Sequence, residues 1–396
     1  MAWRQGEVRL MQAFWIQHQL GICGFLLVLV IIALSNLRTL KRLGRAQAPA
    51  RWPRVSILLP ARNEELNIVE AVECLAGQDY QDFELVVLDD CSEDRTPEIL
   101  NELSGKFDRL RVVHGRPLPD GWLGKLWACD QLSRTATGEL LLFTDADTRH
   151  SPEALRQAVA QLEQDRLDLL TAIPLEQTEG WAEKLVVPVM ARAIMAFLPL
   201  GLAYRWNRPA FTAANGQFML FRRTSYDAIG GHQAVRDNIV DDLGLVRLIA
   251  KQGMRWRLFD AMDLVRCRMY RSTAEVFDGF SKNLFGTFEY RLLPFLFVWT
   301  WLGVVTLEPQ VVLGLGALGS VTSTFSLFSA GAGSALGLML WGISDLRFRF
   351  SWWVPLLYPV SMLLCVVIAF RSVFLTASRR TTWKGRNAVI RRVRLW

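Results

Sequence analysis

Apolar and charged residues are unevenly distributed along this chain. Charged side chains are absent from Leu10–Leu37, occur throughout Arg38–Arg291, are limited to Glu308 within Leu292–Ser344, and are absent again from Ser351–Phe370. A helix that crosses a bilayer needs about 20 mostly apolar residues, so the uncharged segments are long enough to span a membrane. The pattern divides the chain into a transmembrane anchor with a basic linker (1–53), an α/β domain (54–290), and transmembrane helices with a basic tail (291–396).

The middle part alternates between short apolar runs and segments with helical spacing. Five apolar runs predict buried strands at Val55–Leu59, Phe83–Leu88, Leu110–Val113, Leu140–Thr144 and Leu167–Ala172. Helical spacing lies between them, at Glu65–Leu75 and Lys125–Leu132. This alternation predicts a mostly parallel sheet with helices on both faces. Such sheets bind ligands at the carboxyl ends of their strands.

Two basic clusters, Arg38–Arg54 and Arg379–Arg394, contribute to a formal net charge of +7. Both adjoin apolar runs, as the positive-inside rule expects of cytoplasmic segments, so we interpret them as membrane-flanking and expect no nucleic-acid partner. We expect Leu20–Leu34 to be a retained anchor, since we see no small-residue cleavage site ahead of the basic linker. The α/β domain and the tail are then both cytoplasmic.

A domain and a tail on the same side must be separated by an even number of crossings. Four apolar segments satisfy this condition, at Leu292–Leu307, Val311–Ser326, Phe328–Ile343 and Ser351–Phe370. The middle two have about 16 residues each, fewer than the ~20 of an ordinary span. Two full spans with a re-entrant or interfacial stretch are therefore the alternative.

Another apolar segment, Trp181–Trp206, lies inside the α/β part and is interrupted by Pro188 and Pro199. Its tryptophans and basic residues suit the membrane surface. A pair of core helices in the domain explains the same pattern.

Polar residues follow the first two predicted strands. The loop after the first strand precedes a helix, whose free N–H groups suit a diphosphate or a base edge; its candidate residues are Pro60, Ala61, Arg62 and Glu64. An ordinary strand–helix turn is the alternative. Asp89 and Asp90 end the second strand. Adjacent carboxylates are costly there unless they bind hydrogen-bond donors or a cation.

Asp145 and Asp147 follow the fourth strand. In an extended chain, residues i and i+2 point the same way, so these carboxylates can converge on one site. Hard oxygen ligands at this spacing suit Mg²⁺ or Mn²⁺ bridging a nucleotide diphosphate. The ion would neutralise charge on the departing diphosphate.

These three motifs, in this order, resemble the family 2 glycosyltransferases of the GT-A fold over about residues 54–290. Further segments strengthen the resemblance, at Gly121–Ala128, Ala136–Glu139, Gly216–Arg223 and Asp241–Leu248. It implies an α/β, Rossmann-like fold with a mostly parallel sheet, a nucleotide-sugar donor such as UDP-glucose, and Mg²⁺ or Mn²⁺ as cofactor.

The resemblance also implies roles in donor binding. Asp90, with Asp89, would hold the nucleobase, Asp145 would hold the ribose or sugar, and Asp147 would bind the metal ion. Further implied donor contacts are Pro60, Ala61, Arg62, Glu64, Lys125, Ala146 and Lys282.

The same resemblance makes Asp242 the general base. The family usually has Glu where Asp241 stands, so the choice between these two residues stays open. A hydroxyl acceptor must lose a proton as it attacks, and a carboxylate whose pKa is raised by burial or by a neighbouring acid suits that task. A pair of acids favoured by the dipole at a helix N-terminus is the alternative.

The acceptor is indicated by a narrower resemblance. The Gln-x-x-Arg-Trp signature of processive polysaccharide synthases is absent after Asp242. Gly121–Lys125, Tyr270–Asn283 and Trp383–Arg386 instead resemble the hopene-associated and carotenoid glycosyltransferases. This implies a single inverting transfer to a membrane lipid hydroxyl, with Trp383–Arg386 near the active site.

Two alternatives stay open. A polyprenyl-phosphate sugar transferase would use a phosphate acceptor, which needs no general base. A membrane protein that only binds a nucleotide-sugar would show no turnover.

Overall fold

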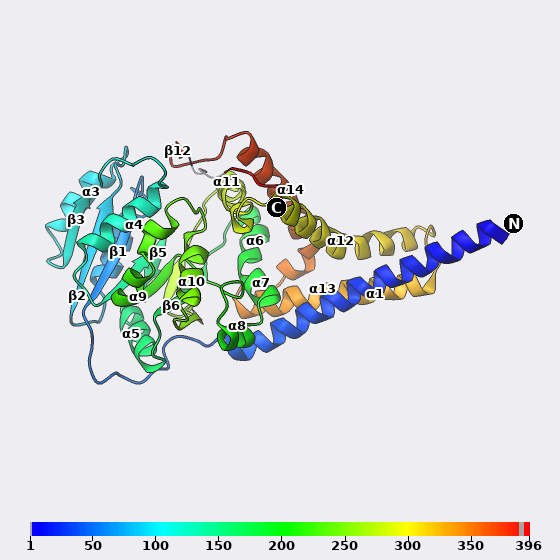
Figure 1. Ribbon diagram of the computed structural model, residues 1–396, viewed down its shortest axis with the longest axis horizontal. Helices are drawn as coiled ribbons and strands as arrows, with labels where there is room; N and C mark the ends of the chain where they lie inside the picture. Colours follow the sequence, from blue (N-terminus) through cyan, green and yellow to red (C-terminus); the bar gives the residue numbers. More distant parts are fainter. Residues whose placement is uncertain (1, 388–391) are drawn as a thin grey trace.

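The chain folds into an α/β domain from which long helices extend to one side, and the N-terminus lies at the far end of these helices (Figure 1). The computed structural model describes residues 2–387 and 392–396. Seven strands form the central sheet: β1 (Val55–Ala61), β2 (Phe83–Asp89), β3 (Leu110–His114), β4 (Leu140–Thr144), β6 (Leu169–Ile173), β8 (Phe218–Arg222) and β9 (Trp256–Asp260).

Their order is β3-β2-β1-β4-β8-β6-β9. Neighbours are parallel except at β8, which is antiparallel to both β4 and β6. The five strands predicted from the sequence correspond to β1, β2, β3, β4 and β6, so the mostly parallel sheet is confirmed.

Helices cover both faces of this sheet. One face carries α2 (Ile68–Ala76), α3 (Thr96–Ser104) and α5 (Ala154–Gln164). The other carries α4 (Gly124–Thr135), α9 (Arg223–Ala228), η1 (Gly231–Val235) and α10 (Asp241–Lys251). Ile57 and Leu59 pack on the first face and Leu58 on the second, and all three are fully buried. Burial on both faces explains why the strands read as continuous apolar runs.

A small second sheet lies beyond the carboxyl ends of β4 and β6. Its strands, in the order β5-β10-β7, are β5 (Thr148–His150), β10 (Val265–Cys267) and β7 (Leu175–Glu176). The chain between β4 and β5 is a turn that contains Asp145 and Asp147. The predicted extended conformation of this segment is wrong, because the chain reverses there to pair β5 with β10.

The long helices are α1 (Ala2–Thr39), α12 (Leu292–Ala317), α13 (Thr324–Arg347) and α14 (Tyr358–Ala377), the last preceded by η3 (Val354–Leu357). Four segments are long and apolar enough to cross a membrane: Phe14–Thr39, Leu292–Ala317, Thr324–Arg347 and Val354–Ala377.

Among the described residues, three of these segments follow residue 291, so the prediction of four spans there is wrong. The alternative of two full spans with a re-entrant stretch stays a prediction. Helix α12 runs 26 residues through Pro309 without a break. The turn falls at Gly319, whose φ is +72°, and Ser323 then caps α13. The sequence prediction instead broke the apolar run at 308–310, inside the continuous helix α12, and carried its next span, Val311–Ser326, across this turn.

Helix α13 runs back alongside α12 to the α/β domain. Gln310 in α12 donates to Ser334 in α13 at 2.9 Å. At the end of α13, Arg347 pairs with Asp260 at the end of β9 at 2.5 Å. The two helices therefore form an antiparallel pair that leaves the domain and returns to it.

Helix α14 begins inside the bundle and also ends at the domain. The Tyr358 hydroxyl accepts from Gln310 at 2.6 Å and donates to the carbonyl of Ser334 at 3.3 Å. Towards its other end, Arg371 donates at 2.8 Å to Ser281 in α11 (Thr273–Asn283). The chain after α13 thus enters the bundle from the domain end and returns to that end, which brings the C-terminal tail beside the α/β domain. That the domain and the tail are both cytoplasmic stays a prediction.

The segment Trp181–Trp206 forms α6 (Trp181–Val186), α7 (Pro188–Phe197) and α8 (Leu200–Trp206), with a bend of 62° before α8. Asn36 in α1 donates to the carbonyls of Met195 and Leu198 at 3.0 and 2.7 Å. Arg192 forms a buried ion pair with Asp345 of α13 at 2.9 Å. This segment therefore packs against both the core of the α/β domain and the long helices. That it also lies at the membrane surface stays a prediction.

Candidate active site

One cavity of about 370 Å³ gathers most of the residues singled out in the sequence. It lies where β1, β2 and β4 end, bounded by the starts of α4 and α10 and by α7 and α11. The predicted residues that line it are Pro60, Ala61, Arg62, Glu64, Asp90, Lys125, Asp145, Ala146, Asp147, Asp241, Asp242 and Lys282. Carboxylates from four separated stretches of chain therefore face one space.

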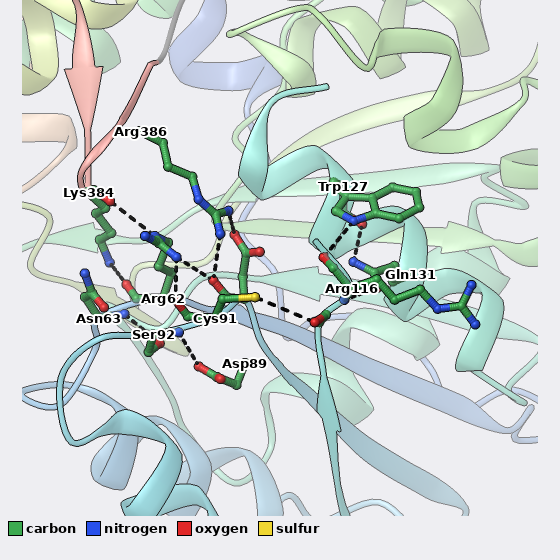
Figure 2. A network of polar contacts seen from close by, with 12 residues as sticks. Arg62, Asn63, Asp89, Cys91, Ser92, Arg116, Trp127, Gln131, Lys384 and Arg386 are labelled. Carbon is green, nitrogen blue, oxygen red and sulfur yellow. Dashed lines mark hydrogen bonds and ion pairs between the residues drawn. The ribbon is translucent and has the colours of Figure 1, made fainter. Parts of the chain in front are cut away.

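Asp89 is the exception among these residues. It is buried, its Oδ1 accepts from the backbone N–H of Ser92 at 3.2 Å, and it is not part of the cavity lining. Figure 2 shows this contact within the network after β2. The geometry gives Asp89 a structural task in the loop, whereas the next residue faces the cavity.

Asp90 has one oxygen engaged and one open. Its Oδ2 accepts from Arg386 at 2.6 Å. Its Oδ1 is buried without a hydrogen-bond partner. Burial raises the pKa of Asp90, an effect that Arg386 and Arg62 partly offset. An unsatisfied buried acceptor is costly, so this oxygen is poised for a ligand donor such as a nucleobase N–H.

The turn after β4 places two carboxylates in different settings. Asp145 forms an ion pair with Lys125 at 2.6 Å. Asp147 Oδ1 is buried without a partner. Burial, followed by the charges of Asp145 and Glu64, raises the pKa of Asp147 to about 7. Such a group gains most from a cation, which would supply the missing partner and offset the repulsion.

Glu176 at the end of β7 was missed in the sequence. It lines the same cavity, its Oε2 is buried without a partner, and burial together with Asp147 raises its pKa to about 8. The signal was available, because Glu176 follows strand β6 as the other acids follow theirs. Among the described residues, no group of three or more His, Cys, Asp or Glu side chains has the geometry of a metal site.

Asp242 lies in the first turn of α10 and is held by two backbone donors. Gly216 N–H donates to its Oδ2 at 3.1 Å, and Leu243 N–H donates to its Oδ1 at 2.7 Å. Burial, followed by the charge of Asp241, raises the pKa of Asp242 to about 7. Asp241 has a looser contact, 3.9 Å from His232. A fixed, buried carboxylate of this kind suits a general base near neutral pH.

Two lysines bring positive charge to the cavity. Desolvation at the cavity lowers the pKa of Lys125, whose side chain is still partly exposed, but the neighbouring Asp145 and Asp241 outweigh this and raise the pKa above the ordinary value. Lys282 in α11 behaves in the opposite way, because burial and the charge of Lys125 lower its pKa to about 7.

The C-terminal tail also reaches the cavity, through Lys384 and Arg386. Lys384 Nζ donates to the carbonyl of Arg62 at 2.7 Å and forms an ion pair with Glu64. The sequence resemblance placed this segment near the active site, and these contacts confirm it. Neither residue was among the predicted donor contacts, because no local pattern reveals a partner more than 290 residues away.

Comparison with known proteins identifies the domain. The sequence profile "Glycosyl transferase family 2" matches residues 56–230. A beta-monoglucosyldiacylglycerol synthase from Trichormus variabilis is 29% identical over 234 residues, which cover 57% of this chain and 47% of that protein. A 4,4'-diaponeurosporenoate glycosyltransferase from Staphylococcus haemolyticus is 24% identical over 235 residues, 58% of this chain and 60% of that protein. This chain thus spans about half the length of the curated relatives it matches.

Among solved structures, the mannosyltransferase PcManGT from Pyrobaculum calidifontis, determined with GDP-Man and Mn²⁺, has a TM-score of 0.54 and 21% identity. The match covers 88% of this chain and 96% of that one, which shows a shared fold. Residues 56–230 are therefore a family 2 glycosyl transferase domain.

Proposed function

We propose that this protein transfers a sugar, with inversion at the anomeric carbon, from a nucleotide-sugar to the hydroxyl group of a membrane lipid at the cytoplasmic face. The observation that carries the proposal is the composition of the cavity, which is charged at one end and apolar at the other. UDP-glucose is the donor that we propose, since the relatives include a glucosyldiacylglycerol synthase.

The apolar end favours a lipid acceptor. Helix α7 contributes Met190, Ala191 and Ile194 to the cavity wall, and Val187, just before the helix, also lines it. The same helix is tied to α13 through Arg192. Met190 lines the cavity and is also 49% exposed, so the cavity opens beside the membrane-directed helices. Burying acyl or isoprenoid carbon against this wall contributes roughly 25 cal/mol per Å².

A divalent cation fits the charged end. The orphaned buried oxygen of Asp147 supports an ion there, Asp145 lies beside it, and the donor's own phosphate oxygens would complete the ligands. When bound, Mg²⁺ or Mn²⁺ would offset negative charge on the leaving diphosphate. Mn²⁺ in the structurally similar mannosyltransferase supports the same assignment.

The residues of the chain supply the remaining steps. Asp242, fixed by Gly216 and Leu243, takes the proton from the acceptor hydroxyl as its oxygen attacks the anomeric carbon. The bond between that carbon and the diphosphate oxygen breaks on the opposite face, so the configuration inverts. Lys125 holds Asp145 and adds positive charge near the leaving group.

Transfer of radiolabel tests the proposal directly. Membranes that contain the full chain are incubated with labelled UDP-glucose, GDP-mannose or a similar donor, with and without EDTA, and the lipid extract is counted. We expect EDTA-sensitive label in the lipid fraction with UDP-glucose. Membranes that leave all label water-soluble, with every donor, would refute the proposal.

A further inference from the structure

The C-terminal tail forms a small hairpin at the cavity. Strands β11 (Thr382–Trp383) and β12 (Arg386–Asn387) pair antiparallel, and Lys384 and Gly385 form the turn with positive φ values of 46° and 77°. Glycine favours this conformation and lysine does not, so the turn is held against a local backbone cost. The contacts that hold it are those of the hairpin with the donor end of the cavity.

Those contacts fix both faces of the hairpin turn. Arg386 reaches the carboxylate of Asp90 at 2.6 Å and its carbonyl at 3.3 Å. Lys384 binds Glu64 and the carbonyl of Arg62, and the Arg62 side chain donates back to the Lys384 carbonyl at 3.2 Å. Figure 2 shows these side chains converging from the tail and from the loops after β1 and β2.

The domain leaves room for this approach. A Cβ atom at Gly124, in the first turn of α4, would lie 2.9 Å from Arg386 Nη1 and 3.2 Å from Asp90 Oδ2. Any side chain there would push the guanidinium away from the carboxylate. The contact between Arg386 and Asp90 therefore depends on the missing side chain at Gly124, which lies 262 positions before Arg386 in the chain.

The charges on the cavity wall indicate what the hairpin contributes to the cavity. Seven acidic residues line the cavity: Glu64, Asp90, Asp145, Asp147, Glu176, Asp241 and Asp242. Five basic residues line it: Arg62, Lys125, Lys282, Lys384 and Arg386. The hairpin supplies two of these five cations. A diphosphate entering this acidic space needs nearby cations, and Arg is well suited to bind phosphate oxygens in pairs.

We propose that the hairpin Thr382–Asn387 is a cationic clamp for the donor, in which Arg386 and Lys384 bind the nucleotide diphosphate while Asp90 keeps its open Oδ1 for the nucleobase. The inference rests on the proposed function for the identity of the donor. In the absence of donor, Glu64 and Asp90 hold the two cations in place. Arg386 has further N–H groups beyond the one on Asp90 Oδ2, so it can bind phosphate without releasing the carboxylate.

Nucleotide binding tests the clamp without requiring turnover. The full chain in detergent is titrated calorimetrically with UDP and with UMP in the presence of Mn²⁺, for wild type, Arg386→Ala and Lys384→Ala. We expect each variant to bind UDP roughly 10- to 100-fold more weakly, the range for a lost hydrogen bond to a charged group. UMP affinity should fall less, because UMP lacks the second phosphate. Arg386→Lys should recover part of the UDP affinity.

Arg380→Ala is the matched control, since it removes the same charge from an exposed position of the same tail. We expect its UDP affinity to stay within twofold of wild type, and size-exclusion profiles to match for all variants. The clamp is overturned if Arg386→Ala binds UDP within twofold of wild type, or if UDP and UMP weaken equally. If the variants bind UDP more weakly as expected but the wild type transfers no sugar to lipid, the proposed function is refuted and the proposed clamp is still supported.

Discussion

Replacing Asp242 with Asn tests the proposed general base. The substitution preserves size but removes the capacity to accept a proton. The amide oxygen of Asn can keep one of the two backbone contacts of Asp242, because the amide nitrogen cannot accept an N–H. Loss of general base catalysis reduces kcat by about 10²- to 10⁴-fold. The donor KM should change little, because this carboxylate is held by Gly216 and Leu243 rather than by the donor loops.

The pH profile supplies a second, independent magnitude. A base with a pKa of about 7 is deprotonated in about 10% of molecules at pH 6 and about 90% at pH 8, so kcat/KM of the wild type should rise about ninefold between them. Activity rises with pH because only the carboxylate form accepts the proton. The Asn variant should lose this rise.

Asp241→Asn is the control that separates the two acids. The charge of Asp241 helps to raise the pKa of Asp242, so its removal should move the rise of kcat/KM to lower pH without abolishing activity. The assay follows transfer of label from the donor to extracted lipid across pH 5.5–9 at saturating Mn²⁺. A variant Asp242→Asn that keeps more than a tenth of wild-type activity would contradict a hydroxyl acceptor and favour a phosphate.

Three other substitutions have defined outcomes. Asp147→Asn should lower kcat by about 100-fold or more and abolish saturation by Mn²⁺, because the neutral amide lacks the carboxylate charge that would hold the cation. A normal Mn²⁺ titration would be evidence against the metal assignment. Asp345→Asn leaves the buried Arg192 charge without its ion partner, at a cost of about 3–5 kcal/mol, so the melting temperature in detergent should fall. The double variant Arg192→Met, Asp345→Leu should recover most of the lost melting temperature. An equal fall in the single and the double variant would contradict this reasoning. Met190→Asp should raise KM for the lipid several-fold and leave the donor KM unchanged, whereas a matching rise in the donor KM would disprove a separate acceptor opening.

Local sequence patterns were sufficient to predict elements in which one class of residue has a single structural role, such as apolar residues in a buried strand. The strands β1 and β4 are apolar on both faces because helices cover both sides of the sheet, and this made them predictable from the sequence. The acids at strand ends were predictable for a related reason, since a carboxylate beside a buried strand needs a hydrogen-bond donor or a cation. Asp89 shows the limit of that rule, because the pattern cannot say which of two adjacent acids turns towards the cavity and which caps a loop.

The helices after residue 291 mark a different limit. Their total apolar length was correct, but the count was wrong, since α12 continues through Glu308 and Pro309, where the sequence prediction placed a boundary, and ends at the turn at Gly319. The path of α14 depends on the contacts of Tyr358 and Arg371 with helices far away in the sequence.

The sequence by itself determined the kind of sheet, the positions of the acids along it, and the presence of long apolar helices, because each follows from short-range periodicity and composition. Only the tertiary structure decided that Lys384 and Arg386 line the cavity, that Glu176 joins the acids there, and that Met190, Ala191 and Ile194 of α7 add apolar surface to its wall. These features depend on contacts between separate elements of the chain, and the tail contacts join residues about 300 positions apart. Such contacts are fixed by how the sheet, the bundle and the tail pack together, and no local pattern carries that information.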